Sequence, residues 1–321
     1  MPSFALPTVS ALVPTYRRVN DLRRCMEALF GQDRKPLEIV VVARPEDSET
    51  WSYLKGLTAT PVPVSVASVT VSGQVQALNA GIEIAAGEVV AITDDDAAPH
   101  PDWCARIAQA FAEHPEVAGV GGRDNVHHGD HLVTGERAVV GIVPKFGRVT
   151  GLHHLGAGPP RYVDVLKGVN GSYRTSLVRA IRFDERLRGT GAQVHWEISL
   201  GLQLRLQGWK LLYDPNILVE HYVATRFDED QRNSYNPLAQ RNMAYNESLI
   251  RMQHLTLPER FVYGLWALGI GTSAAPGLLQ YARFLPYASR GVTGSKTVAT
   301  MMGFVDAWRD LSNQATTSPR A

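Results

Sequence analysis

GEVVAITDDDAAPHPDW, residues 87–103, is the stretch on which the interpretation of this chain depends. Four apolar residues, 89–92, predict a short buried strand, and three consecutive aspartates, Asp94, Asp95 and Asp96, follow it. Adjacent carboxylates repel one another, and burying them is costly unless a cation neutralises them. The triplet therefore predicts a divalent metal site, with a solvated acidic turn as the structural alternative. Magnesium-like ions often combine carboxylates with substrate phosphates, which points to a nucleotide diphosphate.

The composition limits the classes of protein to consider. The chain has 321 residues, 45% hydrophobic and 20% charged, which suits a globular protein of one large domain or two. Its net charge of +1 gives no reason to expect a nucleic-acid partner. Cys25 and Cys104 form neither a disulfide framework nor a zinc motif, which favours a reducing compartment. No signal peptide is expected, because Pro2, Pro7 and Pro14 interrupt an uncharged N-terminus. We therefore expect a cytoplasmic protein, either free or at the inner face of the membrane.

Strand and helix patterns alternate along the first part of the chain. Apolar runs predict strands at 9–13, 39–43, 62–66, 89–92 and 117–120, and amphipathic spacing predicts helices at 21–30, 46–57, 75–86 and 102–114. This alternation is typical of βαβ units with a mainly parallel sheet covered on both faces. Ligands in such sheets bind beyond the carboxyl ends of the strands, where the aspartates should lie. A nicotinamide-type fingerprint is not expected after residue 120, because Asp124 occupies the position of its third glycine.

The middle of the chain is less regular. Residues 127–160 predict a long irregular connection, followed by order at 162–166 and a glycine-rich bend at 167–172 before a short helix near Ser176. A flexible loop at 188–194 precedes a helix at 196–207 and two short strands at 211–213 and 217–219. The second of these strands leads into His221.

The chain becomes helical from residue 236 onward. The predicted organisation is a catalytic domain over 1–235, a helical extension over 236–312 and a disordered tail over 313–321. Residues 261–282 contain no charged side chain and could span a hydrocarbon layer of ~30 Å, but several glycines and Pro276 interrupt them. Three interpretations stay open: a transmembrane helix, a contact of residues 261–285 with a membrane surface or lipid acceptor, and packing on the catalytic domain.

Taken together, five segments resemble the family-2 glycosyltransferases of the GT-A fold, in the order that the family has them. They are VPTYRR (13–18), GQVQALNAGI (73–82), AITDDDAAPHPDW (91–103), GVNGSYR (168–174) and WEISLGLQLRLQGWKLLYDP (196–215). The resemblance covers most of residues 8–222. It implies an α/β, Rossmann-like GT-A fold, with a mixed, mainly parallel sheet flanked by helices and a C-terminal helical extension. It also implies an inverting enzyme that transfers a sugar from a nucleotide-diphospho-sugar to a hydroxyl.

The resemblance implies the catalytic and metal-binding residues. Asp94, Asp96 and His221 would bind Mn2+ or Mg2+, and Glu197 would be the general base. Trp196 departs from the family, because it stands where the first acid of the usual Glu-Asp pair is found. The structural alternatives are that Glu197 is a first-turn acid favoured by the helix macrodipole and that His221 is an ordinary surface or core histidine.

The resemblance also implies how the donor is bound. Pro14, Thr15, Arg17 and Asp47 would line the nucleotide pocket, Asn79 and Gly171 would hold the donor, Asp94 would contact ribose or metal, and Asp95 could share either role.

The nucleobase contact is where the chain departs most from the family. An acidic residue commonly follows the second strand in the family, whereas Arg44 stands here and offers only donors. Either Glu46 or Asp47 replaces that acid, or the base is read by donors, as guanine could be. A UDP-sugar is favoured, and a GDP-sugar comes next.

Other partners and functions stay open. The acceptor would be a carbohydrate or lipid-linked, as in polysaccharide or glycolipid synthesis, and a homo-oligomer is compatible with the sequence. The alternative functions are a non-catalytic sugar-nucleotide-binding scaffold and a nucleotidyltransferase. The latter should carry a glycine-rich phosphate loop after the first strand, and residues 12–22 contain no glycine.

Overall fold

The computed structural model describes residues 5–232, 234–286 and 290–317. Backbone contacts divide the chain into two compact units, each assembled from several segments. Within the described residues, the first unit comprises 5–143, 150–183 and 197–225, and the second comprises 144–149, 184–196, 226–232, 234–286 and 290–317. Two segments expected inside the catalytic domain, 144–149 and 184–196, thus group with the C-terminal helices.

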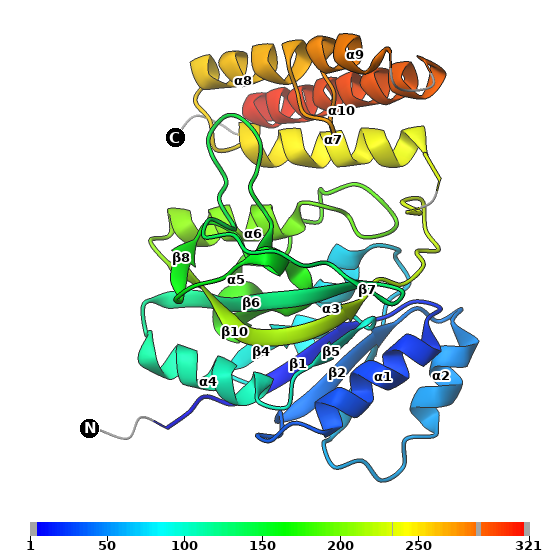
Figure 1. The fold of residues 1–321 in the computed structure, drawn as a ribbon, viewed down its shortest axis with the longest axis vertical. Coiled ribbons are helices and arrows are strands. Elements are labelled where there is room, and N and C mark those ends of the chain that lie inside the picture. The colour runs from blue at the N-terminus through cyan, green and yellow to red at the C-terminus, as the bar shows by residue number, and fades with distance from the viewer. Residues whose placement is uncertain (1–4, 233, 287–289, 318–321) are drawn as a thin grey trace. The chain divides into compact units, whose positions relative to one another are not determined.

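A mixed, mainly parallel sheet lies at the centre of the first unit (Figure 1). In spatial order its strands are β3 (Val64–Ser68), β2 (Glu38–Ala43), β1 (Val9–Pro14), β4 (Val89–Ile92), β9 (Gly171–Arg174), β6 (Val117–His128), β10 (Lys210–Tyr222) and β5 (Ala97–Pro99), with β7 (His131–Leu132) beside β6 and β8 (Arg161–Val163) beside β10. The first four strands are parallel to one another, as are β6 and β10. The predicted fold class is confirmed.

Helices cover both faces of this sheet. The elements are α1 (Val19–Phe30), α2 (Ser48–Lys55), α3 (Gln74–Ile84), α4 (Trp103–Glu113), α5 (Thr175–Ile181) and α6 (Trp196–Leu206), with the short turns η1 (His153–Leu155) and η2 (Gly168–Asn170). Alternate residues of β1 point to opposite faces: Val9, Ala11 and Val13 join the core of α1 and α4, while Leu12 faces α3. Helix α3 approaches β1 closely at Gly81, where a Cβ atom would lie 2.2 Å from Leu12 Cδ1.

The glycine-rich bend predicted at 167–172 contains the turn η2 and leads into strand β9, which was not predicted. Strand β9 lies between β4 and β6 and is antiparallel to both. Gly119 and Gly121 of β6 leave the room that it needs, because a Cβ atom there would lie 2.8 Å from Tyr173 Cδ1 and from the Asn170 carbonyl oxygen, respectively. Glycine at these two positions therefore allows β9 to pack closely against β6.

Two more predictions are corrected at β6 and β10. The strand predicted at 117–120 continues to His128, and the strands predicted at 211–213 and 217–219 form the single strand β10. The pairing of β10 with β6 shifts register between Asp214 and Leu218, and this irregularity explains why the pattern predicts two strands.

The second unit contains the C-terminal helices α7 (Pro237–Met252), α8 (Leu257–Gly269), α9 (Leu278–Phe284) and α10 (Arg290–Thr317). Helices α7 and α10 cross closely at Gly303, where a Cβ atom would lie 2.3 Å from the Arg241 carbonyl oxygen. Helix α8 begins with a capping box of Thr256 and Glu259. Helix α10 extends into the tail predicted to be disordered, and residues 318–321 of that tail lie outside the described residues.

The apolar stretch 261–282 is divided between two helices. Helix α8 ends at Gly269, and Gly271 adopts a left-handed conformation with φ of +66° before α9 begins at Leu278. Within the described parts of the chain, no helix combines the length and apolar character that crossing a membrane would require.

Candidate active site

The aspartate triplet lies between the end of β4 and the start of β5. The amide of Thr93 donates to Leu12 O at 3.1 Å, which continues the pairing of β4 with β1, and Ala97 N donates to Asp94 O at 3.1 Å to close the turn. The carbonyl oxygen of Asp96 accepts from Tyr222 N at 2.8 Å. These backbone bonds place the triplet beside the end of β10, where His221 lies.

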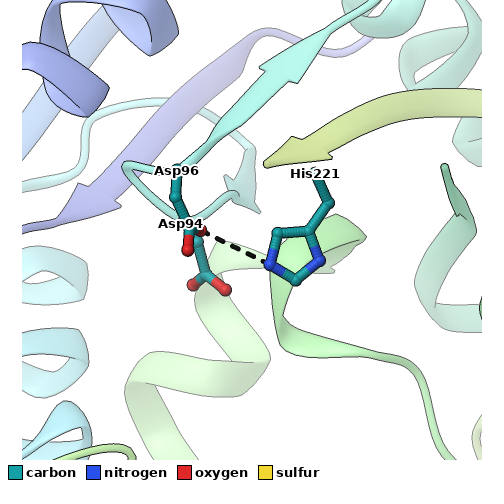
Figure 2. A group of neighbouring side chains, drawn as sticks. All are labelled: Asp94, Asp96 and His221. Carbon is teal, nitrogen blue, oxygen red and sulfur yellow. Dashed lines mark ion pairs between the residues drawn. The ribbon is translucent and has the colours of Figure 1, made fainter. Parts of the chain in front are cut away.

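Asp94, Asp96 and His221 form a potential metal-binding group. Each offers a ligand atom within 4.8 Å of the others. Figure 2 shows the two carboxylates and the imidazole turned towards one another, with Asp96 Oδ1 3.5 Å from His221 Nε2. The second oxygen of Asp96 accepts from Ala224 N at 3.0 Å and lies 3.4 Å from Arg18 Nη1, which fixes the carboxylate.

The chemistry of this group fits a divalent cation. Asp96 Oδ1 and His221 Nε2 are both buried, and neither makes a hydrogen bond with any described residue. Buried polar atoms normally have partners, so this pair is suited to an ion that both can bind. Carboxylate oxygens suit Mg2+ or Mn2+, and the imidazole nitrogen favours Mn2+.

The His221 ring is oriented by a second carboxylate. Its Nδ1 lies 3.3 Å from Asp124 Oδ2, and Asp124 also forms an ion pair with Lys167. Burial lowers the pKa of His221, but the carboxylates of Asp124 and Asp96 outweigh it and raise the pKa to about 9. A divalent ion would compete with that proton, because metal ligation requires neutral imidazole.

Asp95 does not belong to this group and is wholly buried. It accepts from Thr15 Oγ1 at 2.7 Å, and Arg18 contacts both of its oxygens, at 2.5 and 3.1 Å. Burial raises the pKa of Asp95 to about 7, although Arg18 and Thr15 favour its ionised form. Asp95 is thus bound by both Thr15 and Arg18, and the predicted roles of Asp95 and Thr15 toward the donor stay predictions.

The loop after Pro14 is fixed by Asp47. Arg17 adopts a left-handed φ of 58°, and its amide donates to Asp47 Oδ2 at 2.5 Å. Asp47 also caps α2, accepting from Thr50 N at 3.3 Å and Thr50 Oγ1 at 2.8 Å. Both oxygens of Asp47 therefore hold protein groups, which makes it a support of the loop; contact with a nucleobase stays a prediction.

Asn79 and Gly171 occupy different surroundings. The buried amide of Asn79 accepts from Phe183 N at 2.9 Å and donates to Phe183 O at 3.0 Å, so it anchors that segment. Gly171 pairs with Ile92 at the end of β4, next to the triplet. A Cβ atom on Gly171 would lie 3.1 Å from Lys167 O, so a larger residue would crowd this bend.

Glu197 lies in the first turn of α6, is half-buried, and its carboxyl group interacts with the charge of Asp94. Burial raises the pKa of Glu197 to about 7, Asp94 adds to the rise, and the backbone amides of Glu197 and Gly168 oppose it. Asp94, a member of the metal-binding group, is thus near enough for its charge to raise the pKa of Glu197. A raised carboxyl pKa is common at functional sites because a base is most useful near neutral pH.

Sequence reasoning missed three residues of this site, namely Arg18, Asp124 and Lys167. Arg18 belongs to the segment VPTYRR. The neighbouring sequence did not indicate that it pairs with Asp95 and Asp96, which lie almost eighty positions away. Asp124 lies on the part of β6 beyond the predicted strand end. Continuing the alternation of that strand past Gly122 would have placed Asp124 on the face of Val120.

Comparison with known proteins adds independent information. Residues 10–158 match the model of glycosyl transferase family 2. A glucosyl-dolichyl phosphate glucuronosyltransferase from Haloferax volcanii is 28% identical over 116 residues, covering 36% of this chain and 37% of the relative. Glycosyltransferase AglE from the same organism is 26% identical over 104 residues, covering 32% and 34%. The chain thus spans about a third of the length of these relatives.

Solved structures with the same fold cover nearly the whole chain. Mannosyltransferase PcManGT from Pyrobaculum calidifontis, in complex with GDP-Man and Mn2+, has a TM-score of 0.58 at 16% identity, covering 99% of this chain and 89% of that one. S. aureus TarS with UDP-GlcNAc has a TM-score of 0.54 at 16% identity, covering 96% and 92%.

These findings define the fold. It is that of GT-A glycosyltransferases, and residues 10–158 match the model of glycosyl transferase family 2, as the resemblance implied. The family match and the named relatives support a transferase.

Proposed function

We propose that this protein is a metal-dependent, inverting glycosyltransferase that moves a sugar from a nucleotide-diphospho-sugar to a hydroxyl of a carbohydrate or lipid-linked acceptor. One observation carries the proposal: Asp94, Asp96 and His221 converge on one point, and the raised pKa of Glu197 responds to the charge of Asp94. A metal group and a base within electrostatic reach of each other are what a single site for this transfer requires.

Two kinds of chemistry are needed for such a transfer. A divalent metal held by Asp94, Asp96 and His221 would stabilise the charge of the leaving diphosphate. Asp124 keeps the His221 ring in position, and Arg18 forms ion pairs with both Asp95 and Asp96, which offsets the repulsion between these two carboxylates. Glu197 would accept the proton of the attacking hydroxyl, a contribution of about 10²- to 10⁴-fold.

The substitution Glu197→Gln tests the base. Transfer should fall by about 10²- to 10⁴-fold while donor binding is retained, because the amide keeps the size but cannot accept the proton. Transfer at nearly the wild-type rate would exclude Glu197 as the base. Inactivity of the wild type with every donor would favour the scaffold alternative, and the anomeric configuration of the product would decide between inversion and retention.

The nucleotide is proposed to be UDP first and GDP second. The two solved structures named above bind GDP-Man and UDP-GlcNAc, so the fold accommodates both bases. Arg44 stacks on Tyr16, with its guanidinium carbon 3.9 Å from the ring centroid, and would offer donors to guanine. Thermal-shift measurements with UDP, GDP, CDP and dTDP, each with and without Mn2+, would rank the bases. A specific ligand at a hundredfold excess over its Kd stabilises by roughly 2.7 kcal/mol.

A membrane-surface contact through residues 261–285 is part of the proposal. Phe261, Leu265, Leu278 and Leu279 are each more than half exposed, which is unusual for so many large apolar side chains in one segment. Phe261→Asp with Leu265→Asp should reduce flotation of the full chain with anionic vesicles, and unchanged flotation would exclude this surface.

A further inference from the structure

A cavity of about 260 Å³ lies wholly within the second unit. Its walls come from the loop at 188–194, from residues 226–231 and 234–236, and from the first turns of α7. None of Asp94, Asp96, His221 and Glu197 lines it. The cavity is therefore a feature separate from the metal group and the base.

The charges on its walls balance. Arg188 and Arg226 contribute two positive charges, and Glu229 and Asp230 contribute two negative ones. Arg226 pairs with Asp230 at 2.7 Å, while Arg188 pairs with Asp306 at 3.1 Å outside the lining. A cavity with no excess charge offers little attraction to an ion, whereas its carboxylates and amides offer many hydrogen-bonding positions to a neutral ligand.

Individual groups suit a polyhydroxylated ligand. The carboxylate of Asp230 is fixed in the wall, because its Oδ2 accepts from Ala192 N at 3.2 Å and from Arg226 Nη1 at 2.7 Å. Asn242 donates to Glu229 Oε1 at 2.8 Å, which fixes that carboxylate. The partly exposed ring of Tyr235 provides an apolar face beside these polar groups.

The backbone of the loop at 188–194, which forms one wall of the cavity, packs closely against the residues beside it. Gly189 has a φ of +121°, and a Cβ atom on Gly191 would lie only 1.9 Å from Asp230 Oδ1, so side chains are excluded there. Asn246 of α7 accepts from Arg188 N at 2.8 Å and donates to Arg188 O at 3.0 Å and Val194 O at 3.3 Å. One side chain therefore holds both ends of the loop.

We propose that this cavity binds one neutral sugar residue of the acceptor. The inference rests on the proposed transfer, because the loop wall ends at Val194, three residues before the proposed base Glu197 in the chain. The volume of about 260 Å³ equals the space of roughly nine water molecules at about 30 Å³ each, which suits a single monosaccharide unit.

A pair of tryptophan substitutions on α7 tests the proposal in the full chain. Ala239 lines the cavity and is partly exposed, so Ala239→Trp fills the space without entering the helix core. Leu238 is 54% exposed and does not line the cavity, which makes Leu238→Trp the matched control. Binding of methyl glycosides of glucose, mannose, galactose and N-acetylglucosamine is measured by saturation-transfer NMR with saturating UDP or GDP and Mn2+.

The expected result is that at least one glycoside binds the wild type and Leu238→Trp, and that Ala239→Trp weakens this binding at least tenfold. In transfer assays Ala239→Trp should raise the acceptor KM at least tenfold and leave the donor KM unchanged. Equal binding to both variants, or no binding of any glycoside to the wild type, would overturn the cavity proposal. Glycoside binding lost only in Ala239→Trp, in a protein without transfer activity, would support the cavity and overturn the proposed reaction instead.

Discussion

Glu197 links the stability of the protein to pH. Its pKa is raised from 4.5 to about 7, mainly by burial. The folded state thus binds this proton more tightly than the unfolded state does. The resulting stability is fully present below pH 4.5 and is lost as the pH rises through 7. Glu197→Gln cannot ionise, so it should be more stable than the wild type at pH 8, by up to about 3 kcal/mol, and similar at pH 4.5.

Denaturant unfolding of the metal-free protein at several pH values measures this difference. Glu136→Gln, at an exposed position, is the control and should follow the wild type. A difference between Glu197→Gln and the wild type that stays constant with pH would show that Glu197 is not perturbed.

The same pKa predicts the pH dependence of transfer. A general base must be unprotonated, so kcat/KM should fall tenfold per pH unit as the pH drops below about 7 and level off above it. Initial rates between pH 5.5 and 9 with saturating metal would measure the profile. A flat acidic limb would assign the base to another group.

Asp124 should tune the affinity of the site for metal. It contacts His221 Nδ1, and partners of this kind typically change metal affinity by about 10- to 100-fold. Asp124→Asn is therefore expected to weaken Mn2+ binding by that factor in titration calorimetry, while Asp130→Asn, at an exposed position, leaves it unchanged. Equal affinity in both variants would remove Asp124 from the metal site.

At the level of residues, the sequence predicted the three side chains whose ligand atoms the structure brings together, but not the residues that support them. Asp94, Asp96 and His221 belong to recognisable motifs, and the structure places their ligand atoms together. Arg18 and Lys167 could not be assigned from their neighbours in sequence, because their roles arise from contacts with Asp95 and Asp124 made by folding. The roles of Asp47 and Asn79 toward the donor stay predictions, because a motif does not show that their polar groups bind protein atoms.

At the level of elements, Gly81 shows how packing decides whether a substitution raises or lowers the stability of the protein. Alanine in place of glycine within a helix ordinarily stabilises by about 1 kcal/mol. Here the new Cβ atom would lie 2.2 Å from Leu12 Cδ1, so Gly81→Ala should instead destabilise by about 1–3 kcal/mol. Gly269→Ala, with no atom within 4 Å of its Cβ position, is the control and should not destabilise. Thermal unfolding of both variants would test the difference.

Elements with clear periodicity were predicted well, and β9 was not. Strands β1, β2 and β4 and helices α1, α3 and α4 lie within a few residues of their predicted positions. Strand β9 is short, begins with glycine and pairs antiparallel with two strands that are distant in sequence. Its existence depends on space left by Gly119 and Gly121 of another strand, which no local pattern reveals.

At the level of the whole molecule, the second unit draws its parts from three regions of the chain. A protein cut at the predicted boundary, residue 235, would lose the groups that hold 144–149 and 184–196. Arg251 donates to Pro144 O at 3.1 Å and Gly147 O at 3.0 Å, and Asn246 holds the other segment. The fragment 1–235 should therefore be cleaved by trypsin near Arg186 and Arg188 at least tenfold faster than the full chain, and equal protection would contradict this.

The anchoring of the 188–194 loop by Asn246 also sets an order of events during synthesis. Asn246 follows Arg188 by 58 residues, a distance that a ribosome covers in roughly 3–12 s at about 5–20 residues/s. For most of that interval a nascent chain carries Glu197 next to a loop whose ends Asn246 does not yet hold. In a newly synthesised molecule, Asn246 therefore holds the ends of the loop only after α7 has been translated. We expect the proposed activity to appear only after the C-terminal helices have left the ribosome.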